Sequence, residues 1–224
     1  MKLLINDKMQ YATGAPVQVK SPSLADKYSA AITFDITFDD SEVVDCIGVG
    51  YTDATEITIS DGSDSDTITI PAINKNGLYL LTTSFDSESY TISHNGSYVG
   101  RVGIGKYRTL GTNPTKEIGW YTTNESRKTL SGQVISGAGG YSGRRCEMDV
   151  RYKIDEDIYT DIDTAYSTQI SKEFPYFILL DDEQHKVPAS MLHFYAQTKE
   201  PISLLQSSVY KFLYSYKFSF MEAF

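Results

Sequence analysis

The chain has 224 residues, of which 20 are Lys or Arg and 29 are Asp or Glu, so its formal net charge at pH 7 is −9. The first 100 residues hold 5 basic and 14 acidic side chains. The whole net charge therefore lies there, which excludes a chain-wide basic face for nucleic acid. A hydrophobic fraction of 41% with 17 Tyr and 10 Phe excludes a disordered chain, and the length suffices for one large domain or two small ones.

The first strand-like segments alternate between apolar and polar residues. In residues 31–39 every second side chain is apolar, which is the pattern of a half-buried strand. We expect Asp-Asp-Ser at residues 39–41 to end this strand, and the apolar run 43–49 to form a separate, fully buried one. Residues 56–60 and 66–70 alternate again, and the polar turn between them predicts a hairpin.

Further short strands fit residues 78–82, 90–93 and 98–104. The last two flank His94-Asn95-Gly96, and an Asn-Gly pair between alternating segments predicts a hairpin, because both residues tolerate positive φ. Short strands at this spacing, without a helical period, are typical of an antiparallel β-sandwich. The sequence therefore predicts an acidic β-sandwich within residues 1–105.

Residues 106–144 differ in composition from the segments on either side. They are rich in Gly, Thr, Lys and Arg, which predicts a connecting arm. We expect its glycine-rich segment, residues 137–143, to be ordered only within an assembly.

The last third of the chain mixes strand and helix signals. Alternation resumes in residues 145–152, and residues 155–172 combine an acidic start with a 3.6-residue apolar period, which predicts a helix. Short strands fit residues 177–180 and 191–196. The sequence predicts an α+β docking domain over residues 145–224 with one main helix, so the fold class is mainly β.

One long aromatic strand is predicted near the C-terminal end of the sequence. From residue 208 onward the even positions are almost all aromatic and the odd positions mainly polar. Burying six such rings would contribute on the order of 10 kcal/mol, so this face does not stay in water. It packs in the core of its own sheet or docks on a neighbouring subunit, and both can hold. The residues are Tyr210, Phe212, Tyr214, Tyr216, Phe218 and Phe220.

The sequence contains no recognisable catalytic motif. There is no GxSxG elbow, and the glycine pairs at residues 48–50 and 103–105 are not followed by a predicted helix that could bind a dinucleotide phosphate. Cys46 and Cys146 lie 100 residues apart without metal-ligand spacing. Two buried thiols are the simplest interpretation, and a long-range disulfide stays open. We expect no enzyme activity and no cofactor.

Two acidic clusters could bind a metal ion. Asp61, Asp64 and Asp66 are weak calcium candidates, but they lack the ligand pattern of an EF-hand. The acidic residues 181–183 lie near His185 and His193, without the spacing of a zinc site. Solvated turns explain both clusters, so the sequence predicts no metal site.

Several motifs resemble a known family. Residues 46–59 (CIGVGYTDATEITI) resemble the strand–turn–strand of jelly-roll, galactose-binding-like domains in virion proteins of tailed bacteriophages. Residues 100–105, 129–134, 139–141 and 212–224 resemble the second half of phage tail and baseplate components. The resemblance implies a jelly-roll-like sandwich and a non-enzymatic structural role in the virion, near the distal end of the tail or the fibre attachment, with assembly in the host cytoplasm.

The residues themselves agree with an assembly subunit. The start, MKLLINDKMQ, has too short an apolar stretch for a signal peptide, and exposed strand edges and tyrosines suit subunit interfaces. We expect a homo-oligomer that binds other phage tail proteins, without nucleic acid and without membrane insertion. The interface would comprise the six aromatic residues above with Arg144 and Arg145, although ordinary strand-end charges are the simpler interpretation of these two arginines.

A carbohydrate-binding, receptor-recognition module of a tail fibre is the alternative. In that case Trp120, Tyr121 or loop tyrosines would stack against sugar rings. An enzyme acting on cell-wall glycans is the third hypothesis.

Overall fold

The computed structural model shows a mainly β chain with antiparallel sheets, which confirms the predicted fold class. The helix predicted over residues 155–172 lies outside the described residues. The described part contains two short helices, η1 (Lys8–Gln10) and α1 (Val17–Lys20), and no helix there is long and apolar enough to cross a membrane. The structure describes residues 2–4, 6–23, 26–72, 75–109, 112–122, 126–128, 134–136, 142–153, 175–180, 192–198, 203–206 and 213–222.

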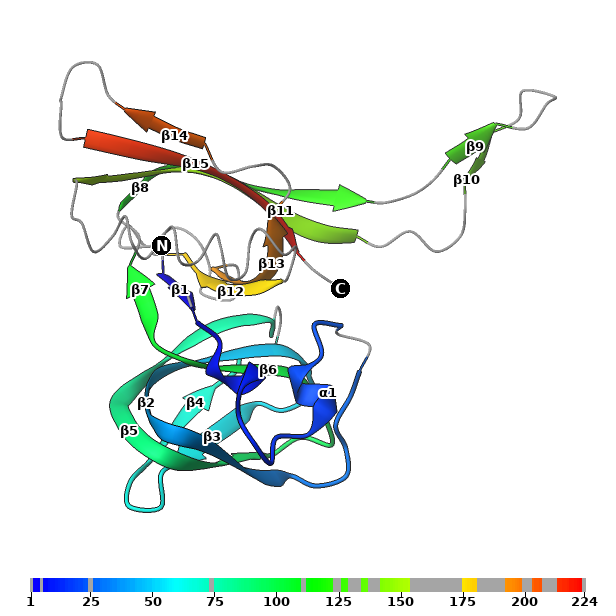
Figure 1. Ribbon diagram of the computed structural model, residues 1–224. Coiled ribbons are helices and arrows are strands. Elements are labelled where there is room, and N and C mark those ends of the chain that lie inside the picture. Colours follow the sequence, from blue (N-terminus) through cyan, green and yellow to red (C-terminus); the bar gives the residue numbers. More distant parts are fainter. Residues whose placement is uncertain are drawn as a thin grey trace.

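Five antiparallel strands form a sheet that bends over on itself (Figure 1). Its two longest strands, β2 (Thr33–Thr52) and β5 (Gly77–His94), pair along their length. The register of this pairing shifts after Thr37 and after Val44. Because extra residues at a bulge bend a strand, the two halves of this ribbon face each other across a core, as the sequence predicts for a β-sandwich. In spatial order the strands are β4 (Ser65–Thr69), β3 (Glu56–Ser60), β5 (Gly77–His94), β2 (Thr33–Thr52) and β6 (Val99–Gly105).

Two details of the predicted sandwich are wrong. Residues 39–41 do not end a strand, because β2 continues through them at its first register shift. The Asn95-Gly96 turn does not close a hairpin either, since β5 and β6 both pair with β2 and not with each other. Asn95 instead accepts hydrogen bonds from the backbone N–H groups of Thr55, at 2.9 Å, and Glu56, at 3.1 Å. Its side chain thus anchors the start of β3.

The core of this sheet lies between its two halves and is closed by the N-terminal segment. Alternation along the strands brings Ile36 and Ile59 from one half together with Ile47 and Ile104 from the other, all almost fully buried. The helices η1 and α1 add Met9 and Val19 to the same core. The sequence from residue 6 to residue 23 therefore acts as a lid on the five-stranded sheet.

A buried ion pair holds this lid in place. Asp7 caps η1 by accepting a hydrogen bond from the Met9 N–H at 3.1 Å, and it pairs with Arg101 of β6. Arg101 also donates to the Val19 carbonyl at 3.2 Å. Burial raises the pKa of Asp7, while Arg101 and two backbone N–H groups oppose that rise.

A second, eight-stranded sheet draws strands from all three predicted segments of the chain. Its first strand, from the N-terminal segment, lies between strands that are 100 and more residues away in sequence. One strand, β14 (Ser203–Gln206), pairs with β15 beside the main path. The main path runs β7 (Tyr107–Thr109), β1 (Lys2–Leu4), β12 (Tyr176–Leu179), β13 (His193–Thr198), β15 (Leu213–Glu222), β11 (Ser142–Lys153) and β8 (Thr112–Thr122).

The two sheets pack through a small apolar cluster in which a ring fits over two glycines. Phe177 of β12 lies against Gly48 and Gly103, which are direct partners in the β2–β6 pairing. A Cβ atom would lie 2.2 Å from the Phe177 ring at Gly48 and 2.7 Å from it at Gly103. Glycine within a strand allows such a close approach, so these residues serve packing. The cluster comprises Leu4, Cys46, Leu78, Phe177 and Tyr195.

Both cysteines are buried free thiols. Cys46 lies in the cluster between the sheets, where its Sγ–H donates to the Gly105 carbonyl at 3.2 Å. Burial, with Asp45 close by, raises its pKa well above the usual range. This thiol is therefore protonated and unreactive at neutral pH.

Candidate functional site

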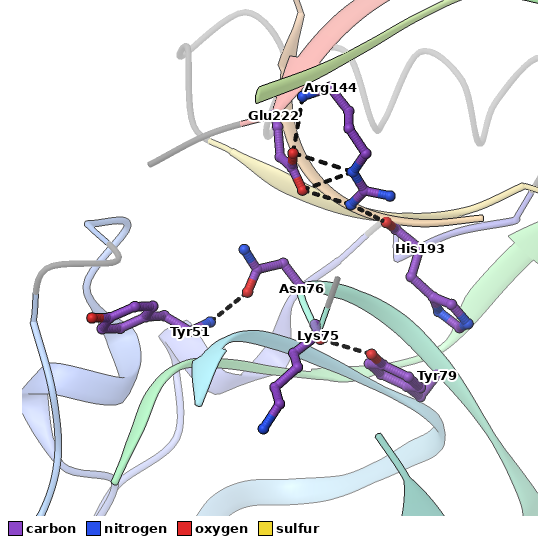
Figure 2. A network of polar contacts seen from close by, with 7 residues as sticks. All are labelled: Tyr51, Lys75, Asn76, Tyr79, Arg144, His193 and Glu222. Carbon is purple, nitrogen blue, oxygen red and sulfur yellow. Dashed lines mark hydrogen bonds and ion pairs between the residues drawn. The ribbon is translucent and has the colours of Figure 1, made fainter. Parts of the chain in front are cut away.

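The junction of the two sheets contains a buried ion pair. Arg144 of β11 is fully buried, and its Nη2 lies 2.5 Å from Glu222 Oε1 on β15 (Figure 2). The same guanidinium donates to the His193 carbonyl at 2.8 Å and lies 4.2 Å above the centre of the Phe194 ring. Charge-assisted, multiple hydrogen bonds of this kind fix the geometry of a buried pair. Arg144 thereby connects β11, β13 and β15.

His193 extends this network to the five-stranded sheet. Its ring stacks on Tyr79 with centroids 4.4 Å apart and planes 16° apart, and its Nδ1 lies 2.6 Å from the Leu78 carbonyl oxygen. Burial lowers the pKa of His193; the hydrogen bond with the Leu78 carbonyl opposes this, the positive charge of Arg144 adds to it, and the net pKa is lowered. The imidazole is therefore neutral at pH 7 and can donate from Nδ1 to that carbonyl.

A second cluster lies on the surface beside this junction. Tyr51, at the end of β2, and Tyr98, before β6, have ring centroids 5.4 Å apart. The Lys27 ammonium lies 4.6 Å from the first ring centre and 4.4 Å from the second. We call Tyr51, Tyr98 and Lys27 the tyrosine platform. Tyr51 is 38% exposed, so the platform faces water.

The backbone of the tyrosine platform is strained at one residue. Tyr51 has φ +55° and is the one non-glycine residue with a positive φ among the described positions. Such a conformation costs a bulky side chain on the order of 1–3 kcal/mol and persists only where neighbours enforce it. Asn76 enforces it here, because its Oδ1 accepts from the Tyr51 N–H at 2.7 Å (Figure 2).

Side chains also fix the other half of the platform. Asp53 Oδ1 accepts from the Tyr98 N–H at 3.1 Å, and the Thr52 hydroxyl donates to the Tyr98 carbonyl at 2.8 Å. The Lys75 ammonium donates to the carbonyls of Asp53, at 3.0 Å, and Ala54, at 3.1 Å. The slight burial of Asp53 raises its pKa, but hydrogen bonds from Tyr98 and Ser97 outweigh this, and the net pKa is lowered. Asp53 is therefore an anion at neutral pH.

The second part of the predicted aromatic interface strand corresponds to β15 (Leu213–Glu222), and its first part, residues 208–212, lies outside the described residues. Phe220 is buried and packs edge-on against Phe194 with ring centroids 5.2 Å apart. Tyr214, Tyr216 and Phe218 also belong to β15. Tyr210 and Phe212 lie outside the described residues. Since β15 lies between β13 and β11, Phe220 contributes to the interior of its own sheet.

The two predicted interface arginines have different environments. Arg144 is fully buried and bound to Glu222 of the same chain, whereas Arg145 is exposed. Arg145 is thus the one of the two that a neighbouring molecule could reach directly. A contact of either arginine with another subunit stays a prediction.

Carboxylates of the predicted calcium turn accept hydrogen bonds from backbone N–H groups. Asp61 Oδ1 accepts from the N–H groups of Ser63 and Asp64, both at 2.8 Å. Asp66 Oδ2 instead accepts from the N–H and hydroxyl of Thr82, at 2.5 and 2.8 Å. Among the residues that the structure describes, no three His, Cys, Asp or Glu side chains are grouped so that they could hold a metal ion. His185 and residues 181–183 lie outside them.

The predicted sugar-stacking residues of the alternative hypothesis lie on an edge strand. Trp120 and Tyr121 belong to β8 and pair with Arg144 and Gly143 of β11. The platform at Tyr51 and Tyr98 was not singled out from the sequence as a site. The two tyrosines are brought together by strand register: Thr52 of β2 lies opposite Val99 of β6, and Tyr51 and Tyr98 directly precede these two residues.

Comparisons of the chain with protein-family models, with curated proteins and with solved structures found no match. The chemistry of the two clusters therefore has to be taken from their geometry. The junction network joins two sheets. The tyrosine platform presents two rings, an ammonium group and a carboxylate to the solvent, which is an arrangement suited to binding.

Proposed function

We propose that the chain is a non-enzymatic structural subunit of a tailed-phage virion, in the tail, the baseplate or the fibre attachment, that assembles with copies of itself and with other tail proteins. The observation that carries the proposal is the hairpin of β9 (Ser126–Lys128) and β10 (Val134–Ser136). Among the described strands these two pair only with each other, and they lie apart from both large sheets (Figure 1).

A two-stranded hairpin in water is marginally stable by itself. This one extends from the paired ends of β8 and β11, where Thr122 lies opposite Ser142. A neighbouring molecule that added a strand or a covering surface would stabilise it. A projecting arm of this kind supports a role in assembly more than a role in single-chain catalysis.

The charge distribution supports association between copies. Residues 106–144, which include the hairpin, hold 6 basic and 2 acidic residues, whereas the first 100 residues hold 5 basic and 14 acidic ones. The acidic sheets of two copies repel each other while the basic arm does not, so the charges favour an orientation in which copies meet through their arms and second halves. The phage assignment itself rests on the resemblance of residues 46–59 and of the second half to virion proteins.

The test is the composition of purified virions. Particles of a phage that encodes the chain are banded in a density gradient, and their proteins are quantified by mass spectrometry. We expect the chain in several copies per particle at a fixed ratio to known tail proteins. Its presence in the infected cell but not in the banded particles would contradict the proposal.

A carbohydrate-binding role is the second candidate, and the tyrosine platform is the observation that favours it. Exposed aromatic rings stack against the C–H faces of sugars, and charged neighbours bind the hydroxyl groups. The two functions are compatible, because a virion subunit can also bind a surface glycan.

A further inference from the structure

We infer that the tyrosine platform, Tyr51 and Tyr98 with Lys27, is a binding site for neutral saccharides. This rests on the second candidate function, carbohydrate binding, for which it names the site and the class of ligand, and it does not depend on the structural role. The site would lie at the edge of the five-stranded sheet where β2 ends and β6 begins.

The platform is rigid before any ligand arrives. Asn76 holds the Tyr51 N–H, and Asp53 and Thr52 hold the backbone of Tyr98. Tyr28, next to Lys27 in sequence, is bridged to Val99 by two backbone hydrogen bonds of 2.8 and 3.0 Å. All three members are therefore tied to the sheet within a residue or two. A site whose parts are already fixed loses little entropy when it binds.

The strain at Tyr51 gives a second reason to assign a function. Glycine or asparagine would adopt φ +55° with less strain than tyrosine, yet a tyrosine occupies this position and is 38% exposed. Burial in the core therefore does not account for this side chain. Positions of this kind concentrate at ligand-binding sites.

The charges around the rings select the class of ligand. The Lys27 ammonium lies over both rings, so a cationic ligand is repelled by a like charge. Residues 33–105, which form the sheet, hold 12 acidic and 2 basic residues, so a polyanionic ligand is repelled. A neutral ligand with an apolar face and many hydroxyl groups meets neither obstacle.

A pyranose fits this description. One face carries C–H groups that pack on an aromatic ring. Its hydroxyl oxygens can accept from the Lys27 ammonium, and its hydroxyl hydrogens can be donated to the exposed Asp53 carboxylate. The site thus combines a stacking surface with one charged donor and one charged acceptor.

The experiment uses the full chain on an array of neutral oligosaccharides, with sialylated and uronic-acid glycans on the same surface. The strongest ligand is then titrated by calorimetry against three variants. Tyr51→Asn removes the ring but keeps a residue that tolerates positive φ, Lys27→Met removes the ammonium and keeps most of the stem, and Tyr11→Asn is the control. Tyr11 is 74% exposed and lies outside the platform.

We expect binding to neutral glycans, with an affinity at least about tenfold lower in Tyr51→Asn, or about 1.4 kcal/mol. Lys27→Met also weakens binding, Tyr11→Asn does not, and unchanged melting temperatures show that all variants are folded. A blank array, binding confined to acidic glycans, or an affinity unchanged by Tyr51→Asn would overturn the inference. Loss of binding in Trp120→Ala but not in Tyr51→Asn would also overturn it, since the sugar would then bind at β8. None of these results bears on the presence of the chain in virions.

Discussion

Gly48 and Gly103 show how single residues determine the contact between the two sheets. Their lack of a side chain leaves room for the Phe177 ring, which is itself almost fully buried. From the sequence alone these glycines could only be compared with nucleotide-binding loops, because the residue that needs the space is 129 positions from Gly48 in the chain. The contact becomes visible only when β12 is placed over β2 and β6.

We expect Gly48→Ala to lower the free energy of unfolding by about 3 kcal/mol, since a Cβ atom would lie 2.2 Å from the ring. Phe177→Ala removes the ring atoms that collide. In that background the added cost of Gly48→Ala should therefore be clearly smaller. Urea denaturation of the four proteins of this cycle measures the effect, and additive costs would show that the ring is not what excludes the side chain.

The buried imidazole of His193 predicts a pH dependence of stability. Burial lowers the pKa of His193, and also that of His94, below the value of about 6.5 in unfolded chains. As the pH falls through about 6.5 the unfolded chain takes up protons before the folded one, so stability is complete above that value and declines below it.

His193→Asn, which can keep a donor to the Leu78 carbonyl, should reduce the loss of stability between pH 7.5 and pH 6. The part of that loss that comes from His94 should remain. Asp7 and Asp45 act in the opposite sense, because burial raises their pKa, and they do so equally in both proteins. Arg144 remains beside residue 193, with Glu222 as its counter-charge. Urea midpoints at the two pH values provide the measurement. An undiminished decline in the variant would show that His193 does not titrate as described.

At the scale of elements, local pattern predicted the half-buried strands. Alternation located the strands at residues 31–39, 56–60 and 66–70, because one face of each meets a core and the other meets water. It could not show that β2 continues through residues 39–41, since a bulge is set by the partner strand. The place of β1 in the second sheet was also beyond prediction, because three residues carry no signal for partners more than 100 residues away.

The candidate site was predictable only in part, for the same reason. Arg144 could be named from the sequence, but its partner Glu222 is 78 residues away and is brought to it by the pairing of β11 with β15. Tyr51 and Tyr98 meet through the register of β2 with β6. Strand register depends on the whole sheet, so neither contact can be read from local sequence.

We expect the β9–β10 hairpin to mediate self-association of the chain. Thr122 and Ser142 are direct partners, so replacing residues 123–141 with Asn-Gly should close the ribbon with a two-residue turn. We expect an unchanged melting temperature and loss of self-association in sedimentation velocity at high concentration. A shortened chain that associates as the full chain does would show that the hairpin is not the docking arm, and a full chain that stays monomeric would count against assembly.

At the scale of the whole molecule, the net charge of −9 is unevenly divided. The five-stranded sheet carries the excess of acidic residues, which keeps its surface solvated and repels its copies. The second half of the chain is balanced in charge and supplies the projecting hairpin and most of the large sheet. The two parts are joined by the Phe177 contact and by His193 on Tyr79, so a molecule anchored through its arm would present the acidic sheet and the tyrosine platform outward.

Electron microscopy of virions labelled with gold-conjugated antibody against the five-stranded sheet tests this account most directly. We expect label at one fixed position along the tail, in several symmetry-related copies, with the acidic sheet accessible to antibody on intact particles. Intact virions that carry no label, while the same antibody detects the chain free in the lysate, would contradict it.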